Sequence, residues 1–359
     1  MLAALSVLPV PEARFAPGVD YPAGAYPCSV AIGLLNGDTA PDLAVADYGS
    51  NSVSVLLGNG DGTFLKPRQF PTAFLPYAVT IGDWNLDGRA DLAVASEGSG
   101  TVTELLGEGD GTFTGRRDLD VGGGAYSVAA GDLNGDGFPD LVATNLNKNQ
   151  VTVLLSRGDG SFLPGVGFPT AHGPRSVAIA DLDLDHIPDL VVACFNSDAI
   201  SILLGNGNGT FRHWIDYATG PSPYSVQVGM LDGDSWPDVA VSSLVSNSVS
   251  VFLGNGHAMF RRRRDVKTGK QPYGLAIADL NSDGRKDLST SDLATSTVSI
   301  ALGEGNGNFL RSQRLPTGSK PQSIAVGDLN QDGMPDFVTA GTGSNTVTVF
   351  LNRGKAAPR

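Results

Sequence analysis

The chain has 359 residues, with 24 Lys and Arg against 37 Asp and Glu, and its formal net charge is -13. A protein this acidic is a poor general binder of nucleic acid or of an anionic membrane, because both carry negative charge. No run of the sequence approaches the roughly 20 apolar residues of a membrane-spanning helix. We therefore expect no nucleic-acid partner and no membrane insertion.

The first predicted element is an N-terminal lead, residues 1–14, which is apolar from Leu2 to Val10 but has no basic residues ahead of that run. We interpret it as a loose extension, with a trimmed signal peptide as the alternative. A single strand is expected next, at residues 15–25, and a short tail at 356–359 ends the chain.

Between these ends the sequence repeats. An aspartate that closes a short polar loop recurs every 49 residues, at positions 42, 91, 140, 189, 238, 287 and 336. A fixed period in this range indicates a repeat architecture. The repeats begin near residues 28, 77, 126, 175, 224, 273 and 322, and we expect residues 15–355 to form one domain.

Each repeat holds about four short runs of β-branched and small apolar residues, separated by Gly, Asp and Asn clusters, which is typical of strands and turns. No run with the 3.6-residue period of an amphipathic helix interrupts them. Four-stranded units repeated radially make a β-propeller, and seven units lie within its usual range of blades. The predicted fold is therefore all-β, a seven-bladed β-propeller with four-stranded blades.

The ends of the chain predict how the ring closes. The last repeat stops after its third strand, Val347 to Leu351, before the phenylalanine that follows this strand in other repeats. Seven periods of 49 residues after Phe15 lead to Pro358, which stands in that missing position. We therefore expect residues 15–25 to supply the outer strand of the last blade, because an unpaired strand edge would otherwise remain.

Five of the loops carry acidic or amide side chains at alternate positions, with the pattern D-x-N-x-D-G-x-x-D or a close variant. Alternate residues of a tight loop can direct oxygen atoms at one hard cation, and crowded carboxylates repel one another without one. We expect about five structural Ca²⁺ ions, each held by the side chains at positions one, three, five and nine and by the carbonyl at position seven. The predicted ligands are Asp83, Asn85, Asp87, Arg89, Asp91, Asp132, Asn134, Asp136, Phe138, Asp140, Asp181, Asp183, Asp185, Ile187, Asp189, Asp279, Asn281, Asp283, Arg285, Asp287, Asp328, Asn330, Asp332, Met334 and Asp336.

Two further copies of the loop, Leu34 to Asp42 and Met230 to Asp238, lack the first ligand and the glycine at position six. We expect them to bind metal weakly or not at all. In the loop from Asp181, His186 replaces that glycine and is expected to strain the turn. The five complete loops hold 16 aspartates, so five divalent ions would leave a net charge of about -3, and the acidity of the chain is mostly that of its metal sites.

With these loops and this spacing, the chain resembles the FG-GAP/VCBS repeats of integrin-α-type propellers and of calcium-containing fungal lectin propellers. The resemblance covers Phe15 to about Lys355, although the Phe-Gly and Gly-Ala-Pro signature survives only in fragments such as Gly123-Gly124-Ala125 and Gly173-Pro174. It implies that the aspartate loops join the first and second strands on one face. It also implies that the opposite face is where integrin-type members often carry ligands.

Four tyrosines are candidate ligand residues: Tyr77, Tyr126, Tyr224 and Tyr273. They stand 14 residues before the closing aspartates, where the other repeats have Cys28, Arg175 and Gln322, and should ring the face opposite the metal loops. A tyrosine offers an apolar ring and a polar tip for stacking on sugars. Hydrogen-bond acceptors at the ends of the second strands are expected beside them, at Asp47, Asn145 and Asp292. The alternative is that the tyrosines only pack between blades.

Other motifs have a structural interpretation first. Arg157-Gly158-Asp159 is a variant of the Gly-Asn-Gly-Asp-Gly turn of other repeats rather than an adhesion tripeptide. The run from Arg261 to Arg264 would protect an outer strand edge by charge, with a patch for acidic polysaccharides as the sharper alternative. Further arginines fall on predicted outer strands: Arg116, Arg117, Arg311 and Arg314.

The function that these features favour is a calcium-stabilised binding module, a monomer outside the cell or at its surface, that takes a glycan or an extracellular protein ligand. Cys28 and Cys194 fall on nearly opposite blades, so we expect no disulfide between them. The four histidines are scattered and make no catalytic triad, so we expect no enzyme. The alternatives are a polysaccharide-degrading enzyme such as a lyase, and a scaffold propeller cut from a larger adhesive protein.

Overall fold

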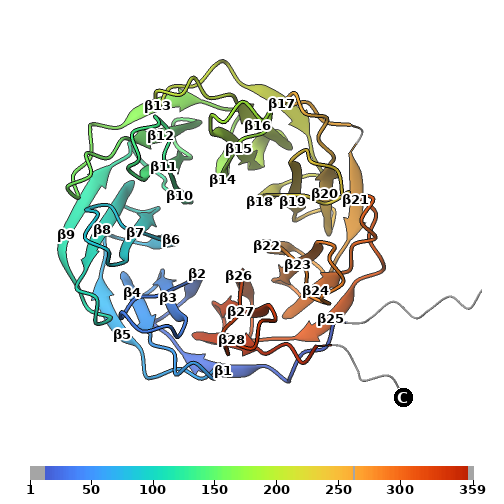
Figure 1. The fold of residues 1–359 in the computed structure, drawn as a ribbon, viewed down its shortest axis with the longest axis horizontal. Helices are drawn as coiled ribbons and strands as arrows, with labels where there is room; N and C mark the ends of the chain where they lie inside the picture. Colours follow the sequence, from blue (N-terminus) through green and yellow to red (C-terminus); the bar gives the residue numbers. More distant parts are fainter. Residues whose placement is uncertain (1–12, 262, 355–359) are drawn as a thin grey trace, which may run out of the picture.

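Seven antiparallel sheets of four strands each stand in a closed ring in the computed structural model of this chain (Figure 1), and residues at the inner edge of every blade line a channel at its centre. The structure describes residues 13–261 and 263–354; most of the predicted lead, the predicted tail and Arg262 lie outside the described residues. Within the described ranges the helical content is one 3-10 turn, η1 (Phe195–Ser197). The predicted all-β, seven-bladed propeller is confirmed.

The two inner strands of each blade flank an aspartate loop. The innermost strands line the channel and are β2 (Pro27–Gly33), β6 (Pro76–Gly82), β10 (Val128–Gly131), β14 (Pro174–Ala180), β18 (Pro223–Gly229), β22 (Pro272–Ala278) and β26 (Pro321–Gly327). The second strands all begin at a closing aspartate and are β3 (Asp42–Asp47), β7 (Asp91–Ser96), β11 (Asp140–Asn145), β15 (Asp189–Cys194), β19 (Asp238–Ser243), β23 (Asp287–Asp292) and β27 (Asp336–Gly341).

The two outer strands of each blade are joined by a tight hairpin in blades 1 to 6. The third strands are β4 (Ser52–Leu56), β8 (Thr101–Gly107), β12 (Gln150–Leu154), β16 (Ala199–Leu203), β20 (Ser248–Phe252), β24 (Thr297–Ala301) and β28 (Thr346–Phe350). The outermost strands of blades 1 to 6 and then of blade 7 are β5 (Arg68–Pro71), β9 (Phe113–Asp120), β13 (Val166–Pro169), β17 (Ile215–Ala218), β21 (Arg264–Lys267), β25 (Gln313–Pro316) and β1 (Val19–Pro22).

Blade 7 is completed by the N-terminal strand, as predicted. β1 pairs antiparallel with β28, with Val19 opposite Val349, and Phe15 forms a further bridge to Asn352. The Phe15 ring lies 4.6 Å from the ring of Phe337, edge to face. Ala13 is buried in the same apolar cluster, so ordered packing begins within the last residues of the predicted lead.

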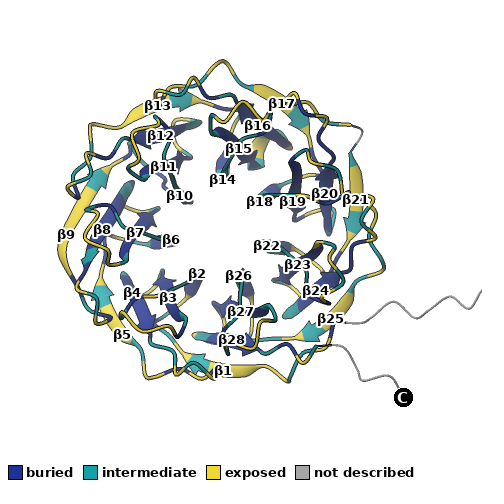
Figure 2. Cartoon of the chain, in the orientation of Figure 1, coloured by how far each residue is buried: buried dark blue, intermediate teal, exposed yellow. Residues whose placement is uncertain are grey.

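The hydrophobic core is divided into clusters that lie between neighbouring blades. Every residue of the second strands is buried, whereas the outermost strands of the blades are largely exposed (Figure 2). One cluster joins Val30 and Leu43 of blade 1 to Val338 and Val347 of blade 7, across the point where the ring closes. Each blade therefore buries its faces against two neighbours, which is how repeat units that lack a core of their own become stable.

Hydrogen bonds between neighbouring blades follow both faces of the ring. On the aspartate-loop face, the hairpin of one blade bonds to the preceding blade, as when the Gly111 amide donates to the Leu35 carbonyl (3.0 Å). On the opposite face, the amide of Leu75 donates to the side-chain oxygen of Asn51 (2.9 Å), and that of Tyr26 to Asn345 (2.9 Å). The last bond joins the first and last blades, so ring closure is secured on this face too.

Two other expectations concern the chain as a whole. Cys28 and Cys194 are both buried, and both are free thiols, so no disulfide joins them. Asp159 of the Arg157-Gly158-Asp159 stretch accepts a hydrogen bond from the Ser161 amide (2.9 Å), the turn contact that Asp61 makes with the Thr63 amide. Among the described residues no helix has the length and apolar character to cross a membrane.

Candidate functional site

The aspartates that close the seven loops hold each blade together from inside. In blade 2, one oxygen of Asp91 accepts a hydrogen bond from the Trp84 amide (3.0 Å) and the other accepts one from the Gly107 amide (2.7 Å). The same two bonds recur at the other closing positions, Asp42, Asp140, Asp189, Asp238, Asp287 and Asp336. These side chains are at most 1% exposed, and burial raises their pKa, to about 6 for Asp140 and Asp189.

In the five complete loops, the first aspartate accepts hydrogen bonds from the turn that follows it. One Asp132 oxygen accepts a bond from the Gly135 amide (2.8 Å) and the other from the Gly137 amide (2.9 Å). The sixth residue has a left-handed backbone in each of these loops, including His186 with φ 67°. Glycine adopts this conformation freely and a histidine does not, so the predicted strain at His186 has a backbone cause.

The third position divides the loops into two electrostatic types. Where it is Asn, its amide donates to the fifth aspartate, as Asn134 does to Asp136 (2.8 Å). In blade 4 it is Asp183, which has no such proton to donate, and oxygens of Asp181, Asp183 and Asp189 all lie within 4.8 Å of one another. One Asp183 oxygen is buried without a hydrogen-bond partner among the described residues. Burial, and then the neighbouring carboxylates, raise its pKa.

The two incomplete loops, Leu34 to Asp42 and Met230 to Asp238, differ from the complete loops in backbone as well as in side chains. Their sixth residues, Thr39 and Ser235, are not left-handed, whereas their fourth residues, Gly37 and Gly233, are left-handed as in the complete loops, so only the second half of the turn differs. In blade 5 the carboxylates of Asp232, Asp234 and Asp238 nevertheless converge within 4.8 Å. Arg261 extends from the outer hairpin of the same blade, and its guanidinium nitrogens lie 3.5 Å from Asp232 and from Asp234. The protein thus supplies a positive charge of its own to this loop.

The four predicted tyrosines meet one another at the end of the channel opposite the aspartate loops. The hydroxyl groups of Tyr77 and Tyr224, from blades 2 and 5, are hydrogen-bonded across the channel. The ring of Tyr77 lies 4.8 Å from that of Tyr126, and the ring of Tyr224 lies 4.1 Å from that of Tyr273. Burial raises the pKa of all four, to about 12 for Tyr126. Much of the surface of these four side chains is therefore buried inside the propeller.

Arg175 stands among these rings on blade 4. Its guanidinium carbon lies 4.0 Å from the centre of the Tyr126 ring and 5.6 Å from that of Tyr224, a distance at which a cation is attracted to the ring face. Its Nε is buried without a hydrogen-bond partner among the described residues. The innermost strands, the four tyrosines and Arg175 line a cavity of about 220 Å³, which we call the inner cavity.

A larger pocket, of about 450 Å³, opens at the same end of the channel. Two of the predicted tyrosines line it, together with residues of the loops that join neighbouring blades and of the loops that follow the second strands. We call it the tyrosine pocket, and its lining is Tyr26, Cys28, Tyr48, Tyr77, Tyr273, Leu293, Lys320, Gln322, Thr342 and Gly343. All four predicted tyrosines line the inner cavity, and Tyr126 and Tyr224 are absent from the lining of the tyrosine pocket.

Two aromatic walls of the tyrosine pocket were missed by the sequence analysis. Tyr26 is 58% exposed, and a side chain at Gly49 would collide with its ring. Tyr48 donates a hydrogen bond to Glu97 (3.0 Å), and its ring lies 6.0 Å from that of Tyr77. Aligning the repeats would have marked both as positions where side-chain type changes from blade to blade, since the next repeat has Leu75 in place of Tyr26 and Glu97 in place of Tyr48.

The acceptors expected beside the tyrosines are not available, and that expectation was wrong. Asp47, Asn145 and Asp292 are fully buried. Asp47 accepts hydrogen bonds from the Gly24 amide (3.0 Å) and from the Ser54 hydroxyl (2.6 Å). Asp47 and Asn145 thereby fasten loops between blades to the second strands, whereas Asp292 accepts hydrogen bonds from Thr290, Thr297 and Ser299. The physical reason is that the second strand is covered on both faces, so that its last residue points into the blade.

Solved propeller structures resemble this fold over nearly its whole length. BBS1N in complex with ARL6DN is 12% identical, with a TM-score of 0.67 over 94% of this chain and 96% of that one. A lectin of Agrocybe aegerita that recognises non-reducing terminal N-acetylglucosamine is 19% identical, with a TM-score of 0.59 over 90% and 84%. A catalytically inactive virginiamycin B lyase from Staphylococcus aureus, with quinupristin, is 13% identical, with a TM-score of 0.62 over 94% and 99%. At these identities the likeness is one of fold.

Sequence comparison is more specific about the repeats. Among curated proteins none matches this sequence. The FG-GAP-like repeat is matched six times, at residues 35–94, 83–143, 132–192, 181–241, 231–290 and 288–339. These matches span the aspartate loops whose geometry is described above and more than half of the chain. The chain therefore belongs to the FG-GAP-like repeat family.

Proposed function

We propose that this protein is a glycan-binding module that acts outside the cell or at its surface, with calcium in its aspartate loops and its ligand in the tyrosine pocket. The observation that carries the proposal is the pocket itself. It places four tyrosines around a space of about 450 Å³, within the range of small-ligand sites. It lies on the face opposite the metal loops, so the two roles are separated in space.

The lining of the pocket suits a sugar. Sugar rings present an apolar C–H face that stacks on aromatic side chains and hydroxyl groups that need polar partners. Tyr26 offers an exposed ring, and Lys320 and Gln322 contribute an ammonium group and an amide to the lining of the same pocket. The recognition of N-acetylglucosamine by the similarly folded Agrocybe aegerita lectin supports the same ligand class.

The aspartate loops suit calcium. Three carboxylates converge within 4.8 Å in blade 4, and an oxygen of Asp183 is buried there without a partner among the described residues. Calcium takes six to eight oxygen ligands and tolerates irregular geometry, which these carboxylates, amides and carbonyls could provide. Bound calcium would neutralise the loops and tie the first two strands together, which is a structural role.

A binding role is favoured over the lyase alternative by the residues present. The lining of the tyrosine pocket contains no histidine, and neither does the lining of the inner cavity. Histidine and carboxyl groups are the commonest general acids and bases, and tyrosine can also act, but burial raises the pKa of Tyr48, Tyr77 and Tyr273 further from neutral pH. We therefore propose recognition without turnover, and incubation of glycans with the protein should leave them intact.

The test is a glycan array followed by calorimetric titration with the best glycan. Tyr26→Ala should weaken binding about tenfold or more, because an exposed stacking surface is lost without disturbing the core. Phe74→Ala is the matched control, since Phe74 is also 58% exposed and lies outside the tyrosine pocket. Equal affinities for the parent and the Tyr26 variant, or an array without retained glycans, would refute the proposal.

A further inference from the structure

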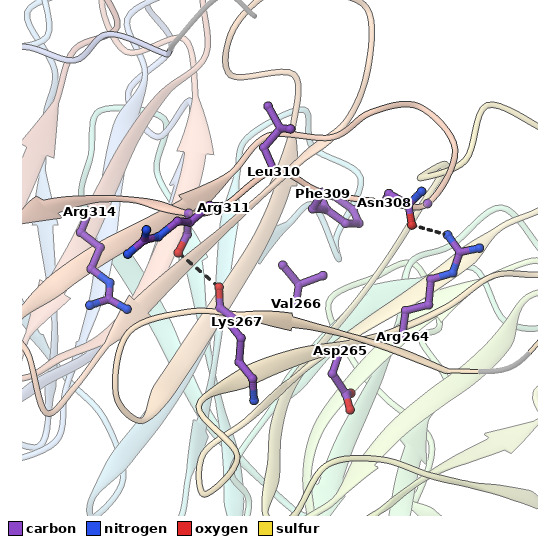
Figure 3. A pocket seen from close by; sticks show the side chains of 11 residues that line it. Arg264, Asp265, Val266, Lys267, Asn308, Phe309, Leu310, Arg311 and Arg314 are labelled. Atoms are coloured by element: carbon purple, nitrogen blue, oxygen red, sulfur yellow. Dashed lines mark hydrogen bonds between the residues drawn. The ribbon is translucent and has the colours of Figure 1, made fainter.

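A groove of about 830 Å³ runs along the outer rim of the ring between blades 5 and 6. It lies between the outermost strands β21 and β25 and the hairpin of blade 6, and it shares no lining residue with the tyrosine pocket. Figure 3 shows Arg311 and Arg314 on one side, Arg264 on the other, and Val266 and Phe309 between them. We call it the rim groove.

The charge of the rim groove is positive on a protein that is acidic overall. Arg264, Lys267, Arg311 and Arg314 line it and are exposed. Within the described ranges, none of these four side chains forms a salt bridge with a carboxylate, although Arg314 interacts electrostatically with the buried Asp292. The one acidic side chain of the lining, Asp265, is bound to Arg263 (3.1 Å) and therefore does not neutralise them.

The other blades show that this charge is a local departure from the repeat. Arg264 corresponds to Arg68 of blade 1, whose charge lowers the pKa of Asp110 in the next hairpin, after the hydrogen bonds from Thr112. In the hairpin that follows Arg264, Asn306 stands in the place of Asp110. An acidic partner present elsewhere in the ring is therefore missing beside Arg264.

Two cationic residues of the rim groove also differ in type from the residues at the equivalent positions of other blades. Arg314 stands where four other blades have an aspartate, namely Asp20, Asp118, Asp216 and Asp265. Lys267 stands where four blades have a proline, namely Pro22, Pro71, Pro169 and Pro316. An acid replaced by a base changes the local charge by two, so these substitutions together convert a mixed surface into a cationic one.

Hydrogen bonds to neighbouring groups hold two of the arginines in place. Arg264 donates to the side-chain oxygen of Asn308 (2.8 Å) and to the carbonyl of Asn306 (3.2 Å). Arg314 donates to the carbonyl of Thr268 (2.7 Å). Each guanidinium has five N–H donors, so several remain for an anion. A guanidinium group that is already held in place loses less conformational entropy on binding a carboxylate or a sulfate than a mobile guanidinium group would lose.

We propose that the rim groove binds a linear acidic polysaccharide. Guanidinium groups pair with carboxylates or sulfates through two parallel hydrogen bonds, and the apolar floor of Val266 and Phe309 can take the C–H face of a sugar ring. A groove lying along the rim admits a chain that continues beyond it at both ends. A nucleic acid fits less well, because its long phosphate backbone would meet the acidic remainder of a molecule of net charge -13.

The test uses the full chain and fluorescence-labelled probes. An oligogalacturonate supplies carboxylates, a heparin oligosaccharide supplies sulfates, and a dextran oligosaccharide of similar length is the neutral probe. Binding of either acidic probe, weakened by salt, with no binding of dextran supports the proposal, and the tighter acidic probe identifies the preferred group. A single-stranded oligodeoxynucleotide that binds more tightly than both acidic probes would overturn it.

Paired variants locate the site. R311Q with R314Q should weaken binding of the acidic probe tenfold or more. R68Q with R116Q is the control, because it removes the same charge from exposed arginines on the outer strands of blades 1 and 2, and it should change binding less than twofold. Tyr26→Ala should leave this binding unchanged, which separates the rim groove from the tyrosine pocket. An equal loss of affinity for the acidic probe in the two double variants would indicate non-specific electrostatic attraction and would refute the proposal.

Discussion

Glu104 lies on the third strand of blade 2 with its side chain fully buried, and both of its carboxylate oxygens lack a hydrogen-bond partner among the described residues. Arg117 of the neighbouring outer strand is 3.7 Å away and is itself half exposed. At the same place the other six blades have only apolar residues, Val55, Val153, Ile202, Val251, Ile300 and Val349. Burial raises the pKa of Glu104 to about 7.

Glu104→Val should stabilise the protein, and more so at high pH. A carboxyl group whose folded pKa is raised destabilises the fold when it must ionise, so the cost is absent below the unfolded pKa, near 4.5, and complete above about 7. The gain at pH 8 is of the order of 3 kcal/mol, at about 1.4 kcal/mol for each pKa unit, and at pH 5 it should be much smaller. Urea unfolding at the two pH values measures it.

Glu304→Val is the control for Glu104→Val, since Glu304 is exposed and the change removes the same charge. It should alter the free energy of unfolding little at either pH. A Glu104 variant as stable as the parent at both pH values would show that Arg117 already compensates the buried charge.

At the scale of the loop, Asp183 and Asp232 form a matched pair for testing calcium. Both occupy the third position of a loop with three converging carboxylates, but only the second loop has an arginine, Arg261, against its carboxylates. Asp183→Ala should remove one equivalent of bound calcium, whereas Asp232→Ala should remove none. A bound ion whose free concentration is 100 times its dissociation constant adds about 2.7 kcal/mol to the free energy of unfolding. The Asp183 variant should therefore also have a lower melting temperature.

Metal content by elemental analysis, together with thermal unfolding in excess calcium, decides the outcome. Loss of one calcium in both variants would show that the blade 5 loop binds metal despite Arg261 and the absent first ligand. No loss in either would remove blade 4 from the calcium sites.

At the scale of the strand, deleting residues 1–25 should open the ring. The deletion removes β1 and leaves the edge of β28 unpaired, and an exposed edge strand invites association. We expect oligomers in size-exclusion chromatography and a large fall in the melting temperature. A synthetic peptide of residues 13–25 should restore the monomer, whereas the same peptide with Phe15→Ala should restore it less, because the ring contact with Phe337 is lost. A truncated chain that stays monomeric and equally stable would contradict the closure described here.

The strands and their closure could be predicted because the information is local and repeated: each turn, each β-branched run and each closing aspartate recurs at a fixed interval. The tyrosine pocket could be predicted only in part. Its walls come from blades 1, 2, 6 and 7, and whether a ring such as that of Tyr77 turns into the channel or toward solvent depends on the width of the channel. Residues of similar spacing thus have different environments, as Tyr273 and Tyr224 do.

The molecule as a whole should respond to chelation and to salt together. Its carboxylates are concentrated in loops on one face, and without divalent ions their repulsion acts on the fold. A chelator should lower the melting temperature, and added sodium chloride should recover part of the loss, because salt screens exposed charges over distances beyond about 10 Å. Calcium-loaded protein is the control and should respond little to salt. Unchanged melting on chelation would exclude a stabilising role for metal.

The two hydrogen bonds of each closing aspartate have a consequence for how such a ring can diversify. In blade 1, Asp42 bonds to the amides of Leu35 and Gly58, which belong to its own blade. Its fastening therefore requires neither an ion nor a neighbouring repeat. Blades 1 and 5 keep these two bonds although their loops lack the first aspartate and the glycine at position six, so the other loop residues can change while the closing aspartate still holds the blade. Sequence changes can therefore accumulate in one blade, and a new binding surface can form there, while the other six blades retain their fold.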